Sequence, residues 1–325
     1  MKGHEAMNTP LIKIEDAIKV FTSHGSAFRR KRFFAIDHVS MEIKQGQTIG
    51  LVGESGCGKS TLGRCILSLL RLDGGKIIFK GIEIHNKKER EFRPLRRELQ
   101  MVFQNPKTSF NPSMTIGQSI INAMCLRTDL SKTAKLEYLT ELLNQVQLSP
   151  LFAGKFPSEV SGGELQRAGL ARALAVQPSF IFLDEPTSAL DMSIRGQIVN
   201  LLLDIQERNK LTYIFVSHDL QLIRYVADYV YVMYMGQIVE SGKREELFSY
   251  PLHPYTKALL AATLLGREER RQARLQSLKG EVIAYDWSGK GCKLAPRCAE
   301  ATPKCFEENQ VLHTINGRQV RCWRI

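Results

Sequence analysis

The stretch GESGCGKST at residues 53–61 decides the fold of this chain. Its glycines, lysine and serine have the spacing of a phosphate-binding loop, in which successive backbone N–H groups point inward at a phosphate. The short apolar run 48–52 before the loop predicts a buried strand, and residues 59–70 behind it predict a helix. Strand, glycine loop and helix, followed by further strands and helices in alternation, predict an α/β fold.

A loop of this kind gives roles to several of its residues. Lys59 can reach the β- and γ-phosphates of a nucleotide, and the Ser60 hydroxyl can ligate Mg²⁺. Cys57 lies inside the loop, and we interpret it as a small filler rather than a nucleophile. The residues predicted to contact the nucleotide are Gly53, Glu54, Ser55, Gly56, Cys57, Gly58, Lys59, Ser60 and Thr61.

A second glycine pair occurs in VSGGELQ at residues 160–166, where Ser161 is predicted to cap a helix. The start of a helix offers free backbone N–H groups and the positive end of the helix dipole, so this is a second anion-binding surface. One nucleotide does not need two such surfaces from one domain. We therefore expect two copies of the domain, each covering the nucleotide bound by the other.

Further motifs follow one another along the chain: MVFQNP with Gln104, FIFLDEP at 180–186, SALD at 188–191 and SHD with His218. With the two glycine motifs, this ordered set resembles that of the nucleotide-binding subunits of ABC transporters. The resemblance implies an ABC-type P-loop nucleotide-binding domain that uses ATP. It also implies an antiparallel β subdomain, a helical subdomain and, in this chain, a small cysteine-rich C-terminal tail.

The resemblance implies roles for individual side chains as well. Asp184 would hold Mg²⁺ together with Ser60 and Gln104. Glu185 would polarise the attacking water, Gln104 would sense Mg²⁺ and water, and His218 would contact the γ-phosphate. The alternative for Asp184 and Glu185 is a structural network of carboxylates, and a lone histidine after an apolar strand is more often structural.

The second glycine motif would act on the partner subunit. By the same resemblance, Ser161, Gly162 and Gly163 contact the γ-phosphate of the ATP that the partner binds. This chain has Glu164 where the family most often has glutamine, and Val160 where it most often has leucine. Both departures leave the serine and the glycines intact.

An aromatic side chain of this family stacks on adenine. Phe21 occupies the corresponding place here, and Phe33 and Phe34 compete for that role. A plain core phenylalanine is nearly as good an interpretation at each of the three positions.

Pattern and composition shifts divide the chain into three parts. Residues 11–250 match the nucleotide-binding domain, with antiparallel edge strands expected over 11–50 and a helical subdomain at about 115–175. A linker helix region is expected over 251–279. The tail at 280–325 has too little apolar content for an independent hydrophobic core.

The chain has 325 residues, no apolar run long enough to span a bilayer and no secretory segment, so we expect it in the cytoplasm. Its net charge is +12, with basic clusters at 29–32 and 267–274. These clusters could face an anionic membrane leaflet or nucleic acid, or simply be solvated. We favour solvated faces and expect no nucleic-acid partner, because no aromatic residues are spaced through the clusters.

Three segments narrow the resemblance to the ATPases of oligopeptide, dipeptide and nickel importers: residues 103–117, residues 226–242 and HPYTKALLAA at 253–262. In that group two different ATPase subunits pair beneath two permease subunits, and an extracytoplasmic binding protein delivers the substrate. The chain would then lie on the cytoplasmic face of the cell membrane as a peripheral subunit.

The working hypothesis is an ATPase subunit that drives peptide import, with nickel or another small solute as the alternative cargo. Two rivals from other classes are a soluble ABC protein of translation or DNA repair and a small-molecule kinase. A soluble ABC protein usually has two fused nucleotide domains or a long coiled-coil insertion, whereas this sequence has the motifs of one nucleotide domain and no such insertion. The second leaves the segment SGGE unexplained.

Four cysteines of the tail have the spacing C-x5-C-x6-C-x16-C: Cys292, Cys298, Cys305 and Cys322. A cytoplasmic location argues against disulfides, and a bound metal would supply folding energy to a segment with little core. Zinc more often shows closely paired cysteines, whereas iron–sulfur clusters take four cysteines at varied spacings. The resemblance to tails of related importer ATPases implies a [4Fe–4S] cluster, with zinc and unliganded thiols as alternatives.

Overall fold

The computed structural model describes residues 9–24, 30–126, 130–264 and 290–325. The chain forms two compact units. The first, called the loop unit here, contains Met1–Lys44, Thr48–Asn86 and Ser217–Ile325; the second, the signature unit, contains Gln45–Gln47 and Lys87–Val216. The basic cluster 267–274 and most of the predicted linker region lie outside the described residues.

The loop unit contains an antiparallel sheet of four strands, which confirms the antiparallel pairing expected over 11–50. Only the second of the two strands lies at an edge, because the first pairs with a neighbour on each side. The alternating pattern buries Ile12 and Ile14 on one face of the first strand. In order across the sheet, the strands are β2 (Arg30–Ile43), β1 (Ile12–His24), β4 (Gly74–Phe79) and β5 (Ile82–Glu83).

The other strands of the loop unit carry the phosphate-binding loop. In order they are β11 (His313–Ile315), β12 (Arg318–Val320), β10 (Gln237–Lys243), β9 (Tyr229–Tyr234) and β3 (Thr48–Val52). β3 is parallel to β9, and the remaining pairs are antiparallel. β12 pairs with β10 through Glu240 and Val320, so strands of the C-terminal tail extend the sheet that contains β3. This explains how a segment with few apolar residues is held.

The runs 229–235 and 237–240 on either side of Gly236 predict a hairpin, and the antiparallel pair of β9 and β10 confirms it. Met235 and Gly236 have φ angles of 44° and 83°, as a two-residue turn with both residues in the left-handed region requires. The helices of this unit are α1 (Lys59–Ile66), α8 (Leu220–Val226), α9 (Arg244–Ser249), α10 (Pro254–Leu264) and α12 (Pro303–Glu307).

The helix predicted from Lys59 to Leu70 ends four residues early. Ser68 adopts a left-handed φ of 52°, and the N–H groups of Leu69 and Leu70 both bond the carbonyl of Arg64. This turn terminates the helix, and Leu69 is consequently 48% exposed instead of lying on the buried face.

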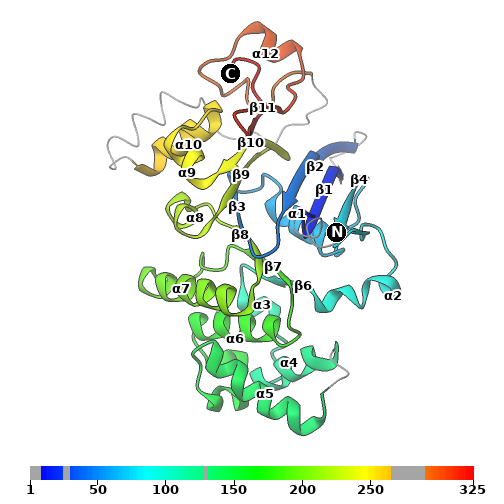
Figure 1. The fold of residues 1–325 in the computed structure, drawn as a ribbon, viewed down its shortest axis with the longest axis vertical. Helices are drawn as coiled ribbons and strands as arrows, with labels where there is room; N and C mark the ends of the chain where they lie inside the picture. Colours follow the sequence, from blue (N-terminus) through cyan, green and yellow to red (C-terminus); the bar gives the residue numbers. More distant parts are fainter. Residues whose placement is uncertain (1–8, 25–29, 127–129, 265–289) are drawn as a thin grey trace, which may run out of the picture. The chain divides into compact units, whose positions relative to one another are not determined.

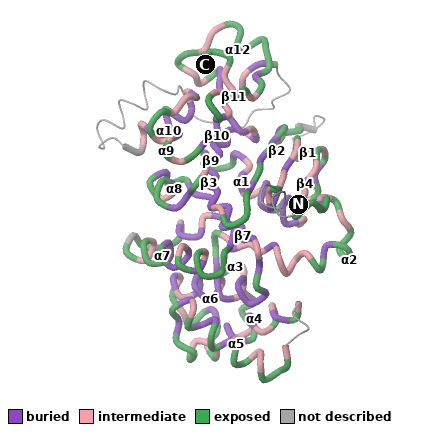
Figure 2. Tube along the Cα trace, in the orientation of Figure 1, coloured by how far each residue is buried: buried purple, intermediate pink, exposed green. Residues whose placement is uncertain are grey.

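The signature unit has three parallel strands, in the order β8 (Thr212–Val216), β7 (Phe180–Asp184) and β6 (Leu99–Val102). β7 and β8 are buried along their whole length, as Figure 2 shows by colour, which confirms the two predicted core strands. Helices of this unit include α3 (Pro106–Ser109), α4 (Ile116–Ala123), α5 (Lys132–Gln145), α6 (Gly162–Leu174) and α7 (Met192–Asn209).

Serine and threonine side chains set the starts of these helices. Thr115, Ser131 and Ser161 cap α4, α5 and α6 by accepting a backbone N–H of the first turn. The helical spacing of Leu136, Leu139, Leu142, Leu143 and Val146 predicts one apolar face for α5 and the residue after it. All of these side chains are buried except Leu136, which is 52% exposed. Among the described residues, no helix combines the length and the apolar character needed to cross a membrane.

Candidate nucleotide site

The phosphate-binding loop connects β3 to α1 and packs against two neighbouring backbone segments. A Cβ atom on Gly53 would lie 2.1 Å from the carbonyl oxygen of Met233, and one on Gly58 would lie 2.0 Å from that of Ala35. Gly58 also has a φ of 110°. Only glycine fits either position, so the loop conformation depends on both β9 and β2.

Lys59 folds back across this loop. Its Nζ donates to the carbonyl oxygens of Gly53 at 2.7 Å and Glu54 at 2.8 Å, and it lies 3.6 Å from Cys57 Sγ. Burial raises the pKa of the Cys57 thiol, although the charge of Lys59 opposes the shift. Cys57 is therefore a neutral, buried thiol, consistent with its interpretation as a filler.

Ser60 and Thr61 stand in the first turn of α1, and His218 lies in the same unit as the loop. His218 is exposed and precedes the first turn of α8 by two residues. Asp219 caps that helix, accepting the N–H groups of Gln221 at 2.9 Å and Leu222 at 3.3 Å. The cap fixes the backbone beside the histidine.

The signature unit brings Gln104 and Glu185 together. Gln104 Nε2 donates to Glu185 Oε2 at 3.0 Å, although the residues are 81 positions apart. Asp184 is the last residue of β7 and is 6% exposed. Glu185 has a φ of 46°, a region that a glutamate rarely adopts, and such strain is concentrated at functional sites.

Ser161 forms a reciprocal cap with Glu164. The Ser161 hydroxyl lies 2.7 Å from a Glu164 carboxylate oxygen, which also accepts the Ser161 N–H at 2.8 Å. These bonds hold the pKa of Glu164 below its usual value. A Cβ on Gly163 would lie 3.0 Å from Ile194, so the glycine permits close packing against α7.

Phe21 and Phe33 face each other across β1 and β2. Their ring centroids are 5.6 Å apart and the rings are stacked, with Phe33 43% exposed. Phe34 lies elsewhere, beneath Lys293 Nζ at 5.9 Å from its ring centroid. The adenine-stacking role stays a prediction for Phe21 and its competitors.

The four tail cysteines line one cavity, together with His253 and Trp323. Burial raises the pKa of Cys292 to about 11 and also raises those of Cys298 and Cys322. Burial opposes ionisation of Cys305 as well, but hydrogen bonds from Thr302 and Trp323 hold its pKa below the usual value. Within the described ranges, no three His, Cys, Asp or Glu side chains are arranged to hold a metal ion.

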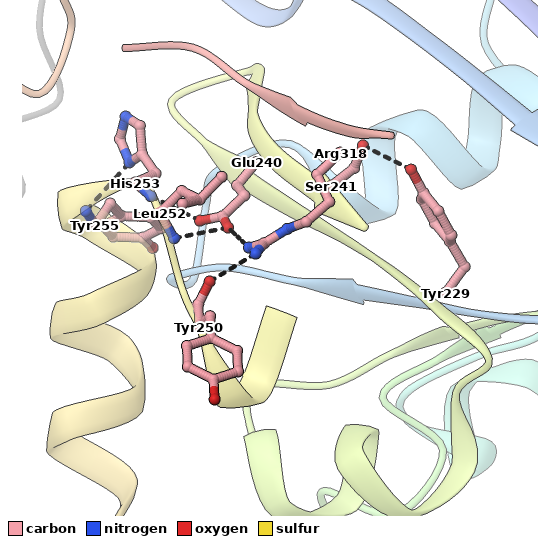
Figure 3. Close-up of polar contacts among 8 residues, drawn as sticks. All are labelled: Tyr229, Glu240, Ser241, Tyr250, Leu252, His253, Tyr255 and Arg318. Atoms are coloured by element: carbon pink, nitrogen blue, oxygen red, sulfur yellow. Dashed lines mark hydrogen bonds and ion pairs between the residues drawn. The ribbon is translucent and has the colours of Figure 1, made fainter. Parts of the chain in front are cut away.

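The loop unit also contains a buried polar cluster, drawn in Figure 3, that was not predicted from the sequence. Glu240 is fully buried, accepts the N–H groups of Leu252 and His253 at 2.9 Å each, and pairs with Arg318. His253 Nδ1 accepts the N–H of Tyr255 at 3.1 Å. The one available signal was Glu240 itself, a charged residue directly after the apolar pair Ile238 and Val239.

Lower pH should destabilise the protein through His253. Burial lowers its pKa to about 3, from 6.5 in an unfolded chain. Below about pH 6.5 only the unfolded state binds this proton, so the free energy of unfolding should lose about 2 kcal/mol from this group between pH 7 and pH 5. His253→Asn, which keeps an acceptor for the Tyr255 N–H, should be less pH-dependent by that amount in urea unfolding. Identical slopes for the two proteins would contradict the assignment.

Comparison with known proteins places these motifs in a family. The family described as "ABC transporter" matches residues 36–188, and "Oligopeptide/dipeptide transporter, C-terminal region" matches residues 239–305. The chain is 42% identical over 302 residues to the "Oligopeptide transport ATP-binding protein AppF" of Bacillus subtilis (strain 168), covering 92% of each protein. The chain belongs to the ATP-binding subunits of ABC transporters. It is thus an ABC-type ATPase, in which ATP hydrolysis is coupled to transport.

Other relatives of this ABC ATPase agree. It is 40% identical over 324 residues to the "Dipeptide transport ATP-binding protein DppF" of Haemophilus influenzae, covering 98% of both chains. Among solved structures, it is similar to the dimeric ATP-binding cassette MJ0796 in a post-hydrolysis state with ADP and Pi. That match has a TM-score of 0.64 and 27% identity, and covers 72% of this chain and 98% of the other. The predicted α/β fold of the P-loop ABC type is confirmed.

Proposed function

We propose that this ABC ATPase drives the uptake of oligopeptides or dipeptides. The match of residues 239–305 to the C-terminal region of oligopeptide and dipeptide transporters carries the proposal. Relatives with oligopeptide or dipeptide transport in their names align with more than nine-tenths of the chain. Peptide is therefore favoured over nickel, and a transporter over a soluble ABC protein or a small-molecule kinase.

The proposed assembly contains a second, different ATPase subunit, two permease subunits and an extracytoplasmic substrate-binding protein. The chain would lie at the cytoplasmic face of the membrane as a peripheral subunit. Two features support a dimer of ATPase subunits: the phosphate-binding loop, and a separate helix whose exposed start carries Ser161. Each site would then combine the phosphate-binding loop of one subunit with the second glycine motif (residues 161–163 in this chain) of the other.

In the site formed by this chain's own loop, several of its residues would have separate roles. Lys59 and the loop N–H groups bind the phosphates, and Ser60, Gln104 and Asp184 would hold Mg²⁺, which neutralises phosphate charge. Glu185 accepts the proton of the attacking water. Gln104 orients the Glu185 carboxylate through the 3.0 Å hydrogen bond between the two side chains. His218 donates to the γ-phosphate.

Purification from membranes and reconstitution would test the function. The tagged chain is isolated in detergent from its own host, and copurifying proteins are identified by mass spectrometry. We expect two permeases and a second ATPase, and uptake of labelled dipeptide or oligopeptide by liposomes that contain the complex with ATP. Absence of permeases, or uptake of nickel without peptide, would contradict the proposal.

We further infer that Cys292, Cys298, Cys305 and Cys322 hold a [4Fe–4S] cluster with a structural role. Four thiols lining one cavity supply the donor set that such a cluster uses, and cluster binding would ionise them although burial raises the pKa of three of the four. Such a cluster would add folding energy to the tail. Anaerobic purification should give a brown protein with iron and sulfide in equal amounts. Stoichiometric zinc without iron would favour the alternative metal, and neither metal would favour free thiols.

A further inference from the structure

Glu54, the second residue of the phosphate-binding loop, is held from two sides by the C-terminal part of the chain. Both guanidinium Nη atoms of Arg297 donate to its carboxylate, at 2.9 Å and 3.2 Å. The backbone N–H of Glu54 donates to the Tyr255 hydroxyl at 2.9 Å. Side chain and backbone of one loop residue are therefore fixed by residues 201 and 243 positions away.

The surroundings of these contacts are buried, which strengthens them. The side chain of Arg297 is 12% exposed and that of Glu54 is 26% exposed, whereas Tyr255 is fully buried. The rings of Tyr234 and Tyr255 pack with centroids 4.6 Å apart, and the Tyr234 hydroxyl accepts a further bond from Arg297 at 3.3 Å. A bidentate pair at low exposure has a fixed geometry, unlike an ordinary surface salt bridge.

The segment that carries Arg297 is itself anchored to the strands beside the loop. Lys293 Nζ lies 2.6 Å from the carboxylate of Asp37 on β2 and donates to the carbonyl of Met235 at 2.8 Å. Tyr255 is anchored through His253, whose backbone N–H is bound by the buried Glu240 (Figure 3). Neither contact to Glu54 depends on a freely moving side chain.

We propose that Arg297 and Tyr255 are positioning residues for ATP binding: through Glu54 they hold the phosphate-binding loop in the conformation that receives the phosphates. Neither residue needs to touch the nucleotide. A loop ordered in advance loses less conformational entropy when the ligand binds, so its affinity is higher. The proposal rests on the ATP binding of the family and does not depend on the cargo.

The proposal predicts weaker ATP binding when either contact is removed from the full-length chain. Since a hydrogen bond to a charged group contributes about 1.5 kcal/mol or more, Arg297→Ala should raise the Kd for Mg–ATP about tenfold. Arg297→Lys, which keeps the charge but not the fork, should raise it in the same direction. Tyr255→Phe should raise it about fivefold, because it removes one neutral hydrogen bond of about 1 kcal/mol.

Glu54→Ala separates positioning from a mere charge effect. If Arg297 acted only by its positive charge near the phosphates, removing the negative charge of Glu54 would tighten ATP binding. Positioning predicts the opposite sign, so Glu54→Ala should weaken ATP binding about as much as Arg297→Ala does. The double variant Glu54→Ala/Arg297→Ala should then bind ATP no more weakly than either single variant.

Titration calorimetry with Mg–ATP on the purified full-length chain measures these constants, and the melting temperature without nucleotide is recorded in parallel. Lys304→Ala is the matched control, because it removes one positive charge of the same tail. Lys304 contacts Glu308 and the Trp323 ring, and neither of these residues contacts Glu54. The control should keep the wild-type Kd. Lower melting temperatures with unchanged Kd for Arg297→Lys and Tyr255→Phe would overturn the proposal, as would tighter binding by Glu54→Ala.

Discussion

Replacing Glu185 by glutamine should slow hydrolysis of the ATP held by this chain's own loop at least about 100-fold, while that ATP still binds. The carboxylate accepts the hydrogen bond of Gln104 at 3.0 Å, and its backbone is held at an unusual φ of 46° at the end of β7. An amide of the same shape cannot accept the proton of the attacking water. The closed, ATP-bound pair of ATPases should therefore accumulate.

A single-turnover assay of the assembled transporter measures this loss. The complex is loaded with two equivalents of labelled ATP, and the wild type should hydrolyse both, whereas Glu185→Gln should leave one intact. Glu141→Gln, the same change on the exposed surface of α5, is the matched control and should hydrolyse both. Hydrolysis of both equivalents by Glu185→Gln at the wild-type rate would exclude Glu185 as the base.

Local patterns made much of this site predictable. The order of strand, glycine loop and helix predicts the elements around residues 53–61, with their ends correct to within a few residues. The serine before two glycines specifies the start of α6. These features depend on backbone geometry and capping, which neighbouring residues determine. The same holds for the hairpin about Gly236, because glycine readily adopts the left-handed φ of 83° found there.

Contacts between distant segments were not predictable in this way. No spacing rule connects Arg297 to Glu54, because the two meet only after the C-terminal strands have joined the sheet of β3. Leu136 fits the helical period of α5 and is nevertheless exposed, since periodicity identifies a face but not where its packing partners end. The early end of α1 likewise depends on the left-handed φ of Ser68. Because this residue is not a glycine, the sequence does not predict a helix end there.

Replacing Ser161 by arginine should abolish hydrolysis at the other site, that of the partner's loop. Ser161 starts α6 and is exposed, next to the N–H groups of Gly162 and Gly163. A long cationic side chain there would displace the γ-phosphate of the partner's ATP from these donors, while the site of this chain's own loop keeps its donors from the partner. Since removal of one such donor from a transition state typically costs about 100-fold in rate, we expect at least that loss at the partner's ATP.

Part of any effect of Ser161→Arg will come from the lost helix cap, and Ser131→Arg measures that part. Ser131 caps α5 as Ser161 caps α6, accepting the N–H of Ala134 at 3.2 Å, but it belongs to no glycine motif. Each variant should lose about 1 kcal/mol of stability from its cap. Only Ser161→Arg should leave one ATP equivalent intact in the single-turnover assay, and combined with Glu185→Gln it should leave both. If this chain hydrolyses ATP at full rate as a monomer, or if Ser131→Arg and Ser161→Arg behave alike, the two sites are not shared between subunits.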